Sequence, residues 1–449
     1  VSFCLGVIPA ARRGHSASQP LHALKPNPPA LAPVGRFRWT VCALLFAATA
    51  INYMDRQILG LLAPTLEKEI GWTEIEYGPI VTAFQAAYAL GLVVFGRWVD
   101  VIGTRHGYAV SIAFWSVAAM AHALARGVFG FGVARFALGL GEAGNFPAAV
   151  KTVAEWFPRR ERALAAGIFN SGSNVGAVLA PLLVPWLTLR FGWQMAFVAL
   201  GATGFVWIGL WYWLYAAPRE SCRVSAEELA HIHSDPPEPA AAKISWRELL
   251  RHRQTWAFVV GFAFSAPIWW FYLYWLPKFL HKQYGLDLAG LGPPLVVVYT
   301  MTCIGSVGGG WLSGFLMKRG WSVNAGRKTA MLICALCVVP VVSAARASNL
   351  WVATFLIGLA ASAHQGWAAN LFTLASDLFP KQAVASVVGL GGMVGSITAM
   401  AFSQSAGLIL EKTGSYWTLF AIASSAYVVA LTIMHLLIPD LEPAKLDHA

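Results

Sequence analysis

Four charged residues lie inside long apolar stretches of the sequence. Asp55 and Arg56 fall in a run from about residue 39 to residue 62, and Arg135 and Glu142 fall in another from about residue 129 to residue 150. A charge at the centre of a bilayer costs about 2.5–3.5 kcal/mol on insertion scales. Such residues persist where they face a protein interior or a watery cavity, and there they usually belong to a proton, ion or substrate path.

The spacing of these residues indicates what chemistry they could do. Arg135 and Glu142 are nearly two helical turns apart, so they share one helix face at a separation of about 10 Å, together with Asn145. The neighbours Asp55 and Arg56 point about 100° apart and need not pair with each other. An arginine fork binds both oxygens of a carboxylate. The four charges therefore predict an anion anchor beside titratable acids, or alternatively a charge network that only holds helices together.

Composition indicates the elements that position these residues. The chain has 449 residues, of which 57% are hydrophobic and 12% charged, with a mean hydropathy of +0.59. About twelve apolar runs are long enough to cross ~30 Å of hydrocarbon. We therefore expect an all-α membrane protein with twelve transmembrane helices in two six-helix bundles. The expected divisions are a tail over 1–38, bundles over 39–216 and 254–438, a linker over 217–253, and a tail over 439–449.

The net charge of +11 is unevenly distributed. If the N-terminus lies inside and twelve spans alternate, most Lys and Arg residues fall in inside segments. The positive-inside rule then places both termini in the cytoplasm. The basic surplus thus indicates topology and not a nucleic-acid partner. Residues 1–36 lack an apolar core followed by a cleavage site, so we expect no signal peptide but either a disordered tail or an artefact of an upstream start site.

An internal repeat supports the division into two halves. Glu155–Arg159, of sequence Glu-Trp-Phe-Pro-Arg, recurs as Asp377–Lys381, of sequence Asp-Leu-Phe-Pro-Lys, and the same offset takes Gly167 to Gly389. Repeated halves of a transporter place the substrate site between them, near the midplane of the membrane. The Cys334-x-x-Cys337 pair lies in an apolar helix without further ligands, so we interpret it as core, and we expect neither metal nor cofactor.

A loop from Gly96 to Arg105 carries Gly96, Asp100 and Gly103 between two apolar runs. Glycines let helix ends approach closely, and a carboxylate there can cap a neighbouring helix N-terminus. We expect Asp100 to hold a gate closed by such a cap and by meeting cytosolic arginines such as Arg105.

Several motifs resemble known transporters. The Gly96–Arg105 loop resembles the signature of the major facilitator superfamily, although Val101 replaces the usual basic residue. Asn52–Arg56, the Arg135 and Glu142 spacing, and Trp156-Phe157-Pro158 resemble its anion:cation symporter family. The segments Gly167–Asn174 and Ala363–Thr373 resemble hexuronate transporters in particular.

This resemblance implies roles for individual residues. Arg135 would contact the substrate anion, with Arg56 as a second cation, while Glu142 and Asp55 would take protons. Tyr88 matches a substrate-contacting tyrosine. Further candidates for substrate contact share a polar or aromatic character and an expected inward position, although each could instead be satisfied by neighbouring helices: Asn170, Ser173, Asn174, Tyr272, Trp275, His364, Gln365 and Asn370.

The sequence thus predicts a secondary transporter, not an enzyme, that imports a hexuronate such as glucuronate or galacturonate with protons. We expect a bacterial inner-membrane location, partners limited to the organic anion, protons and lipid, and function as a monomer. Another organic anion, such as galactonate, glucarate or an aromatic acid, is the close alternative. A sensor that binds sugar acids without moving them is more remote. A drug exporter is disfavoured because buried arginines repel cations, and no P-loop supports ATP-driven pumping.

Overall fold

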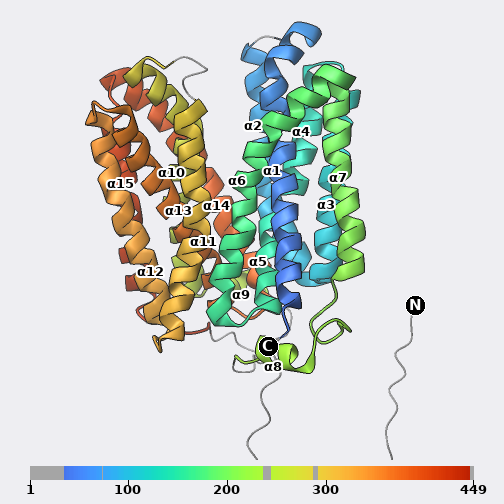
Figure 1. Cartoon of the computed structure of the whole chain (residues 1–449), viewed down its shortest axis with the longest axis vertical. Helices are drawn as coiled ribbons and strands as arrows, with labels where there is room; N and C mark the ends of the chain where they lie inside the picture. Colours follow the sequence, from blue (N-terminus) through green and yellow to red (C-terminus); the bar gives the residue numbers. More distant parts are fainter. Residues whose placement is uncertain (1–34, 73, 236–243, 287–291, 445–449) are drawn as a thin grey trace, which may run out of the picture.

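The structure is a computed structural model that describes residues 35–72, 74–235, 244–286 and 292–444. These residues form fifteen α-helices and two 3₁₀-helices and contain no strand. Figure 1 shows the long helices standing side by side in two groups. Of the expected terminal tails, residues 1–34 and 445–449 lie outside the described residues.

The first group holds α1 to α7. Its main pairs are α1 with α6, α2 with α4, and α3 with α7. The bounds of its helices are α1 Phe37–Ile70, α2 Glu74–Ile102, α3 Thr104–Ala121, η1 His122–Leu124, α4 Val128–Glu142, α5 Asn145–Trp156, α6 Arg159–Phe191 and α7 Trp193–Leu214.

The second group holds α10 to α15. Its main pairs are α11 with α13, α10 with α14, and α10 with α15. The bounds of its helices are α10 Arg253–Tyr284, α11 Gly292–Lys318, α12 Val323–Val338, η2 Val339–Arg346, α13 Leu350–Leu378, α14 Val384–Thr413 and α15 Trp417–Leu437. The two groups meet mainly where α2 contacts α14 and α6 contacts α11.

The helices have the length and composition of membrane spans. Within the described residues, ten are long and apolar enough to cross a bilayer, namely α1, α2, α3, α6, α7, α10, α11, α12, α14 and α15. The α4–α5 pair and α13 occupy the two remaining positions of a twelve-helix fold. Large apolar side chains such as Leu90, Leu182 and Trp213 are exposed on these helices, as expected for surfaces that face lipid and not water.

The fourth span is broken, whereas the sequence predicted one run from about residue 129 to 150. α4 ends at Glu142 and α5 begins three residues later. Side chains of neighbouring helices bind carbonyls at the break. Ser111 Oγ donates to the Gly141 carbonyl at 2.8 Å, and Asn52 Nδ2 donates to the Glu142 carbonyl at 3.5 Å. Such partners make a break tolerable at membrane depth.

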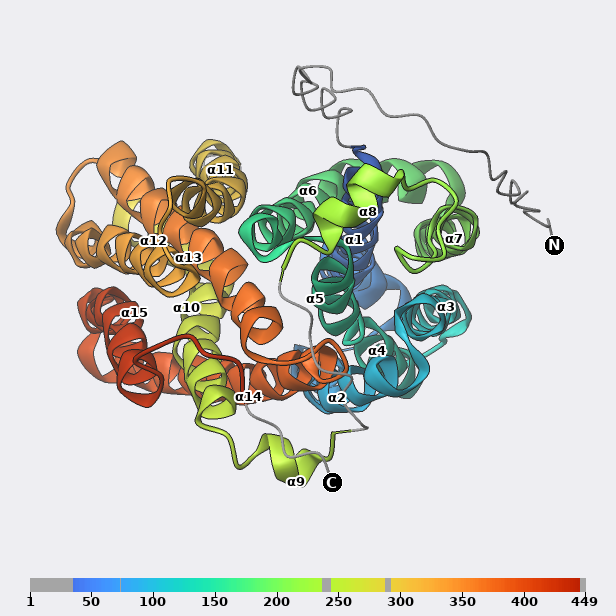
Figure 2. The same cartoon turned by 90° about the horizontal axis from the view of Figure 1, so that it is seen from below.

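The first part of the linker packs against the start of α1, at what we call the linker end of the molecule (Figure 2). The linker contains α8 (Ala226–Ile232) and α9 (Trp246–Leu249). Ser225 begins α8 as its N-cap, accepting the Glu228 N–H at 3.2 Å. Glu228 in turn accepts the backbone N–H groups of Phe37 and Arg38 at 3.1 and 3.0 Å. A carboxylate at a helix N-terminus is stabilising, so the linker holds α1 in place.

Candidate functional site: a charged cavity between the two helix groups

Two adjoining cavities lie between the helix groups. One, the central cavity, has a volume of about 120 Å³, and the other, the vestibule, about 340 Å³. Both are lined by Tyr53, Arg56, Ser173, Trp269 and Trp270. The vestibule continues along α1 from Arg56 toward residue 61, which is away from the linker end where α1 begins.

Arg56 forms an ion pair with Glu142 at the edge of the central cavity. Its Nε lies 2.9 Å from Glu142 Oε2, and its Nη2 donates to Asn52 Oδ1 at 3.3 Å. The rings of Tyr53 and Tyr88 lie 4.8 and 4.7 Å from the guanidinium carbon. Cation–π contacts of this kind are stabilising and orient the guanidinium. Arg56 is therefore fixed in place while part of it faces the cavity.

Arg135 lines the vestibule beside this pair. Its Nη1 donates to the backbone carbonyl of Arg56 at 3.1 Å, and its guanidinium lies 5.7 Å from the Phe84 ring. Both cations therefore come from the first helix group and lie next to each other.

Asp55 is 1% exposed, and neither of its carboxylate oxygens has a hydrogen-bond partner among the described residues. Glu142 Oε1 is likewise buried without one. A buried ionised carboxylate that lacks hydrogen bonds is costly, which applies in full to Asp55, whereas Glu142 has the Arg56 guanidinium on its other oxygen. The local charges of Arg56, Arg135, Asp55 and Glu142 cancel when both acids are ionised, and one protonation leaves a net positive charge.

Amides from the two groups meet in the central cavity. Asn170 on α6 donates to Gln365 Oε1 on α13 at 2.5 Å and to Ser306 Oγ on α11 at 3.1 Å. His364 Nδ1 lies 2.6 Å from the Tyr427 hydroxyl, and its ring stacks on Trp269 with centroids 5.1 Å apart. Asn170, His364 and Gln365, which were predicted to face inward, thus line the central cavity.

Of the five other residues that were predicted to contact the substrate, two line a cavity and three do not. Ser173 lines both cavities, and Asn174 lines the vestibule. Asn370 donates to the carbonyls of Gly309 and Gly366 at 2.9 Å each, which ties α13 to α11. Tyr272 and Trp275 are not among the lining residues of either cavity.

The aromatic residues that line both cavities are Tyr53, Trp269 and Trp270, and the predicted Tyr88 lines the central cavity. The sequence placed the tryptophans in the same aromatic run as Tyr272, and the run alone does not say which face of α10 turns inward. Tyr53 was within reach of sequence reasoning, because it lies one helical turn before Arg56 and shares its face.

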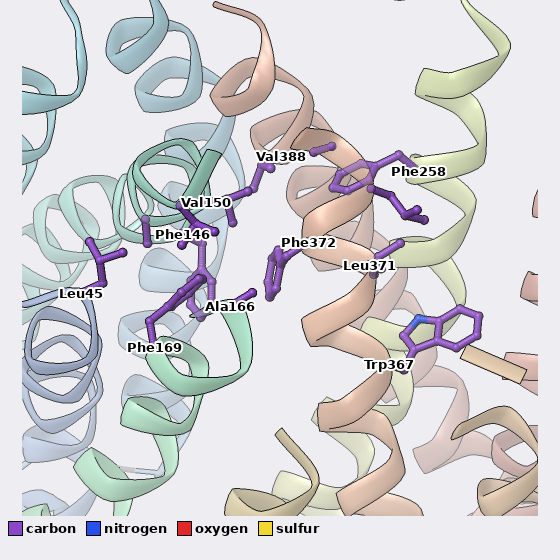
Figure 3. Packing of buried hydrophobic residues seen from close by; sticks show 14 of the residues in the cluster. Leu45, Phe146, Val150, Ala166, Phe169, Phe258, Trp367, Leu371, Phe372 and Val388 are labelled. Carbon is purple, nitrogen blue, oxygen red and sulfur yellow. The ribbon is translucent and has the colours of Figure 1, made fainter. Parts of the chain in front are cut away.

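Phenylalanines from both groups close the central cavity on its linker side. Phe146 on α5 stacks on Phe372 on α13 with centroids 5.3 Å apart, and Phe169 on α6 lies 6.3 Å from the same ring. The ring of Phe262 on α10 also contacts the Phe372 ring, with centroids 5.4 Å apart. Figure 3 shows Phe146 and Phe169 turned toward Phe372 across the boundary between the groups.

Asp100 joins the groups at the linker end by capping α14. Its Oδ2 accepts the backbone N–H of Ser386 at 2.7 Å, and its Oδ1 accepts that of Ala385 at 3.3 Å. Its side-chain partner is Lys151, with Nζ 2.9 Å from Oδ1. The structure differs here from the expected contact, because Arg105 donates instead to the Tyr212 carbonyl at 3.2 Å.

The glycines of this loop have distinct positions. Gly103 has a φ of 86°, a conformation that favours glycine. Gly96 lies against α14, where a Cβ would be 2.6 Å from the Ala385 carbonyl oxygen. The equivalent contact in the other half is Gly310 on α11, where a Cβ would be 2.0 Å from the Ala163 oxygen. The repeat thus produces two matching glycine contacts between the groups.

A second charged cluster at the linker end was not predicted. Arg327 Nε donates to Asp377 Oδ2 at 3.0 Å, and its Nη2 donates to the Arg159 carbonyl at 2.6 Å. Arg162 of the first group donates to the Ser376 carbonyl at 2.5 Å and lies 3.6 Å from Asp377. The sequence feature that could have indicated this cluster is the acid at the same position of both repeats, Glu155 and Asp377.

Taken together, two groups of membrane helices around a polar central cavity define a membrane transporter. Comparison with known proteins agrees: residues 45–403 match the Major Facilitator Superfamily, and the chain belongs to that family. It is 34% identical over 391 residues to the hexuronate transporter of Escherichia coli (strain K12), covering 86% of this chain and 90% of that protein. It is 33% identical over 308 residues to the galacturonate transporter of Dickeya chrysanthemi, covering 67% and 89%.

The fold has a close counterpart among solved structures. The proton:xylose symporter XylE, bound to 6-bromo-6-deoxy-D-glucose, superposes with a TM-score of 0.69 at 14% identity, covering 92% of this chain and 98% of that one. The solved structure shows the fold, and the family match with the two bacterial relatives shows that the chain is a transporter and not an enzyme.

Proposed function

We propose that this protein imports a sugar acid, a hexuronate such as glucuronate or galacturonate, together with protons across a bacterial inner membrane. The observation that carries the proposal is the Arg56–Glu142 ion pair at 2.9 Å, with Arg135 beside it and an adjoining cavity lined by amide, hydroxyl and tryptophan side chains. The similarity to a hexuronate and a galacturonate transporter supports the choice of substrate.

The pair suggests how substrate and proton are coupled. While Glu142 is ionised it occupies Arg56, so a substrate carboxylate finds no free cation there. Protonation of Glu142 releases the guanidinium, whose fork then binds the carboxylate. Asp55, buried without hydrogen bonds, is the second proton site. Loss of the proton returns Glu142 to Arg56 and expels the substrate.

Alternating access follows from the contacts at the linker end, which we assign to the cytoplasm. In this structure the Asp100 cap and the Phe372 cluster join the two groups on that side. The vestibule extends toward the opposite end, which in this assignment is the outer side. Release of substrate inward then requires the α2–α14 and α6–α11 contacts to separate while the outer ends approach.

Proton coupling also suits the energetics. A monoanion entering against an inside-negative potential meets about 2.3 kcal/mol per 100 mV. One accompanying proton makes the step electroneutral, and two make it driven by the potential. We propose the monomer as the working unit, since both cations, both acids and the cavity come from one chain.

The test is uptake of labelled glucuronate into proteoliposomes that hold the purified protein. We expect accumulation above equilibrium when the outside is more acidic than the inside, and only equilibration without a gradient. Protein-free liposomes are the control. Uptake that is unaffected by the gradient would disprove proton symport, and no uptake of either uronate would disprove the substrate.

A further inference from the structure

We propose that the cavity selects sugar acids with one carboxylate and an uncharged far end, and discriminates against aldarates, which carry a carboxylate at both ends. The inference rests on the proposed sugar-acid transport and narrows its substrate class. The observation behind it is the one-sided distribution of charge around the cavities.

Both cations belong to the first helix group. Arg56 is on α1 and Arg135 on α4, and they are adjacent because Arg135 donates to the Arg56 carbonyl at 3.1 Å. Among the described residues that line the central cavity and the vestibule, the second group contributes no Lys, Arg, Asp or Glu. Its polar lining consists of Ser265, Trp269, Trp270, Tyr299, His364, Gln365 and Ser396.

The two serine hydroxyls of this wall are poor partners for a carboxylate. Ser265 Oγ donates its proton to the Gly261 carbonyl at 2.7 Å, and Ser396 Oγ donates to the Gly392 carbonyl at 2.9 Å. A hydroxyl has one proton, so both oxygens are left with acceptor lone pairs only. An acceptor suits a substrate hydroxyl, which can donate. A carboxylate only accepts, so it finds repulsion there.

Of the remaining polar groups of the wall, Gln365 and the two tryptophans carry no charge. Gln365 Oε1 is occupied by Asn170, which leaves its amide N–H groups to meet a ligand. His364 stacks on Trp269 and meets the Tyr427 hydroxyl. An amide N–H binds a sugar hydroxyl or carbonyl well but cannot neutralise a full charge.

The cations cannot readily serve two carboxylates of one molecule. An extended six-carbon chain holds its ends apart, whereas Arg56 and Arg135 lie together. The net charge of Arg56, Arg135, Asp55 and Glu142 also disfavours a second carboxylate. One protonated acid leaves a local charge that a monoanion cancels, while a dianion requires both Asp55 and Glu142 to be protonated. A second carboxylate would thus be buried without a cation, which lowers affinity roughly tenfold to a hundredfold or more.

The sharpest test compares two open-chain acids that differ at one carbon. Galactonate ends in a hydroxymethyl group where galactarate ends in a second carboxylate. Calorimetry on the purified full-length protein measures the Kd of each, and the pair glucuronate and glucarate is measured in the same way. We expect each monocarboxylate that binds to do so at least about tenfold more tightly than its dicarboxylate partner.

The outcomes separate the two hypotheses. A dicarboxylate that binds as tightly as its monocarboxylate partner would overturn this inference while leaving sugar-acid transport intact. If none of the four acids binds, the proposed function fails and the inference falls with it.

A gain-of-function variant adds a second test. Ser396→Lys places a cation on the uncharged wall, and Ser396→Gln is a neutral control of comparable length. We expect the Lys variant alone to improve galactarate binding relative to galactonate. Equal effects of the two variants on both acids would contradict the assignment of this wall to the uncharged end, and the wild-type comparison stands if either variant fails to fold.

Discussion

Asp100 on α2 accepts the backbone N–H of Ser386 on α14 at 2.7 Å, so a single carboxylate joins the two helix groups at the linker end. The acid also binds Lys151 on α5, and the N-terminus of α14 is the positive end of a helix dipole. The contact therefore combines a cap, a dipole and an ion pair at a boundary that the proposed alternating access has to open.

We predict that Asp100→Asn destabilises the closed linker end by roughly 1–2 kcal/mol, a typical value for a cap and a partly buried dipole contact. A two-state equilibrium then shifts about fivefold to thirtyfold, toward the state open at the linker end, and net transport slows. Alkylation of a single cysteine introduced in the vestibule measures the opposite opening, and its rate should fall.

Glu155→Gln is the matched control for this prediction. Glu155 is an acid at the same end, but its partners Thr104 and Tyr215 belong to its own helix group. The variant should leave the labelling rate unchanged. A rate that stays constant or rises in Asp100→Asn means that Asp100 does not hold the gate.

The second prediction concerns the cations. Arg56→Ala and Arg135→Ala should each weaken glucuronate binding by roughly 2–5 kcal/mol, since each removes one partner of a buried charge contact. Lys at either position should restore little, because an ammonium lacks the bidentate fork. Calorimetry provides the Kd values, and Arg105→Ala, outside the cavities, is the control. Unchanged binding in both alanine variants would refute the anion anchor.

The third prediction separates binding from coupling. Glu142→Gln resembles a permanently protonated acid in shape and no longer neutralises Arg56. The variant should therefore bind glucuronate and catalyse counterflow exchange, but it should lose accumulation driven by a pH gradient. Paired measurements of exchange and of net uptake in proteoliposomes test this. Accumulation at the wild-type level would remove Glu142 as the coupling site.

The sequence predicted the features that depend on a local pattern of residues. Apolar run length indicated the membrane helices, and the cost of buried charge singled out Arg56, Arg135 and Glu142 before any contact was known. Asp100 was expected to cap a helix because its loop sits at a helix end. These inferences need only periodicity, charge and spacing along one element.

The remaining features depend on how helices are rotated and shifted against each other. Two acids and two arginines on different helices allow several pairings, and only packing selects Arg56 with Glu142. Lys151 is the partner of Asp100 because of the way α5 packs against α2, which no pattern along a single element shows. The inward face of α10 was likewise ambiguous, since Trp269 and Tyr272 lie on one aromatic run.

The last prediction tests which face of α10 meets the substrate. Trp269 lines both cavities and stacks on His364, whereas Trp275, six residues further along α10, lines neither. A tryptophan face in contact with a sugar ring contributes about 0.5–1.5 kcal/mol, so Trp269→Ala should raise the Kd for glucuronate roughly twofold to tenfold. Trp275→Ala removes the same side chain from the same helix and should leave the Kd unchanged. Because either truncation can loosen packing, thermal unfolding of both variants is followed alongside calorimetry. A larger loss of affinity in Trp275→Ala than in Trp269→Ala, at similar stability, would show that the other face of α10 meets the substrate.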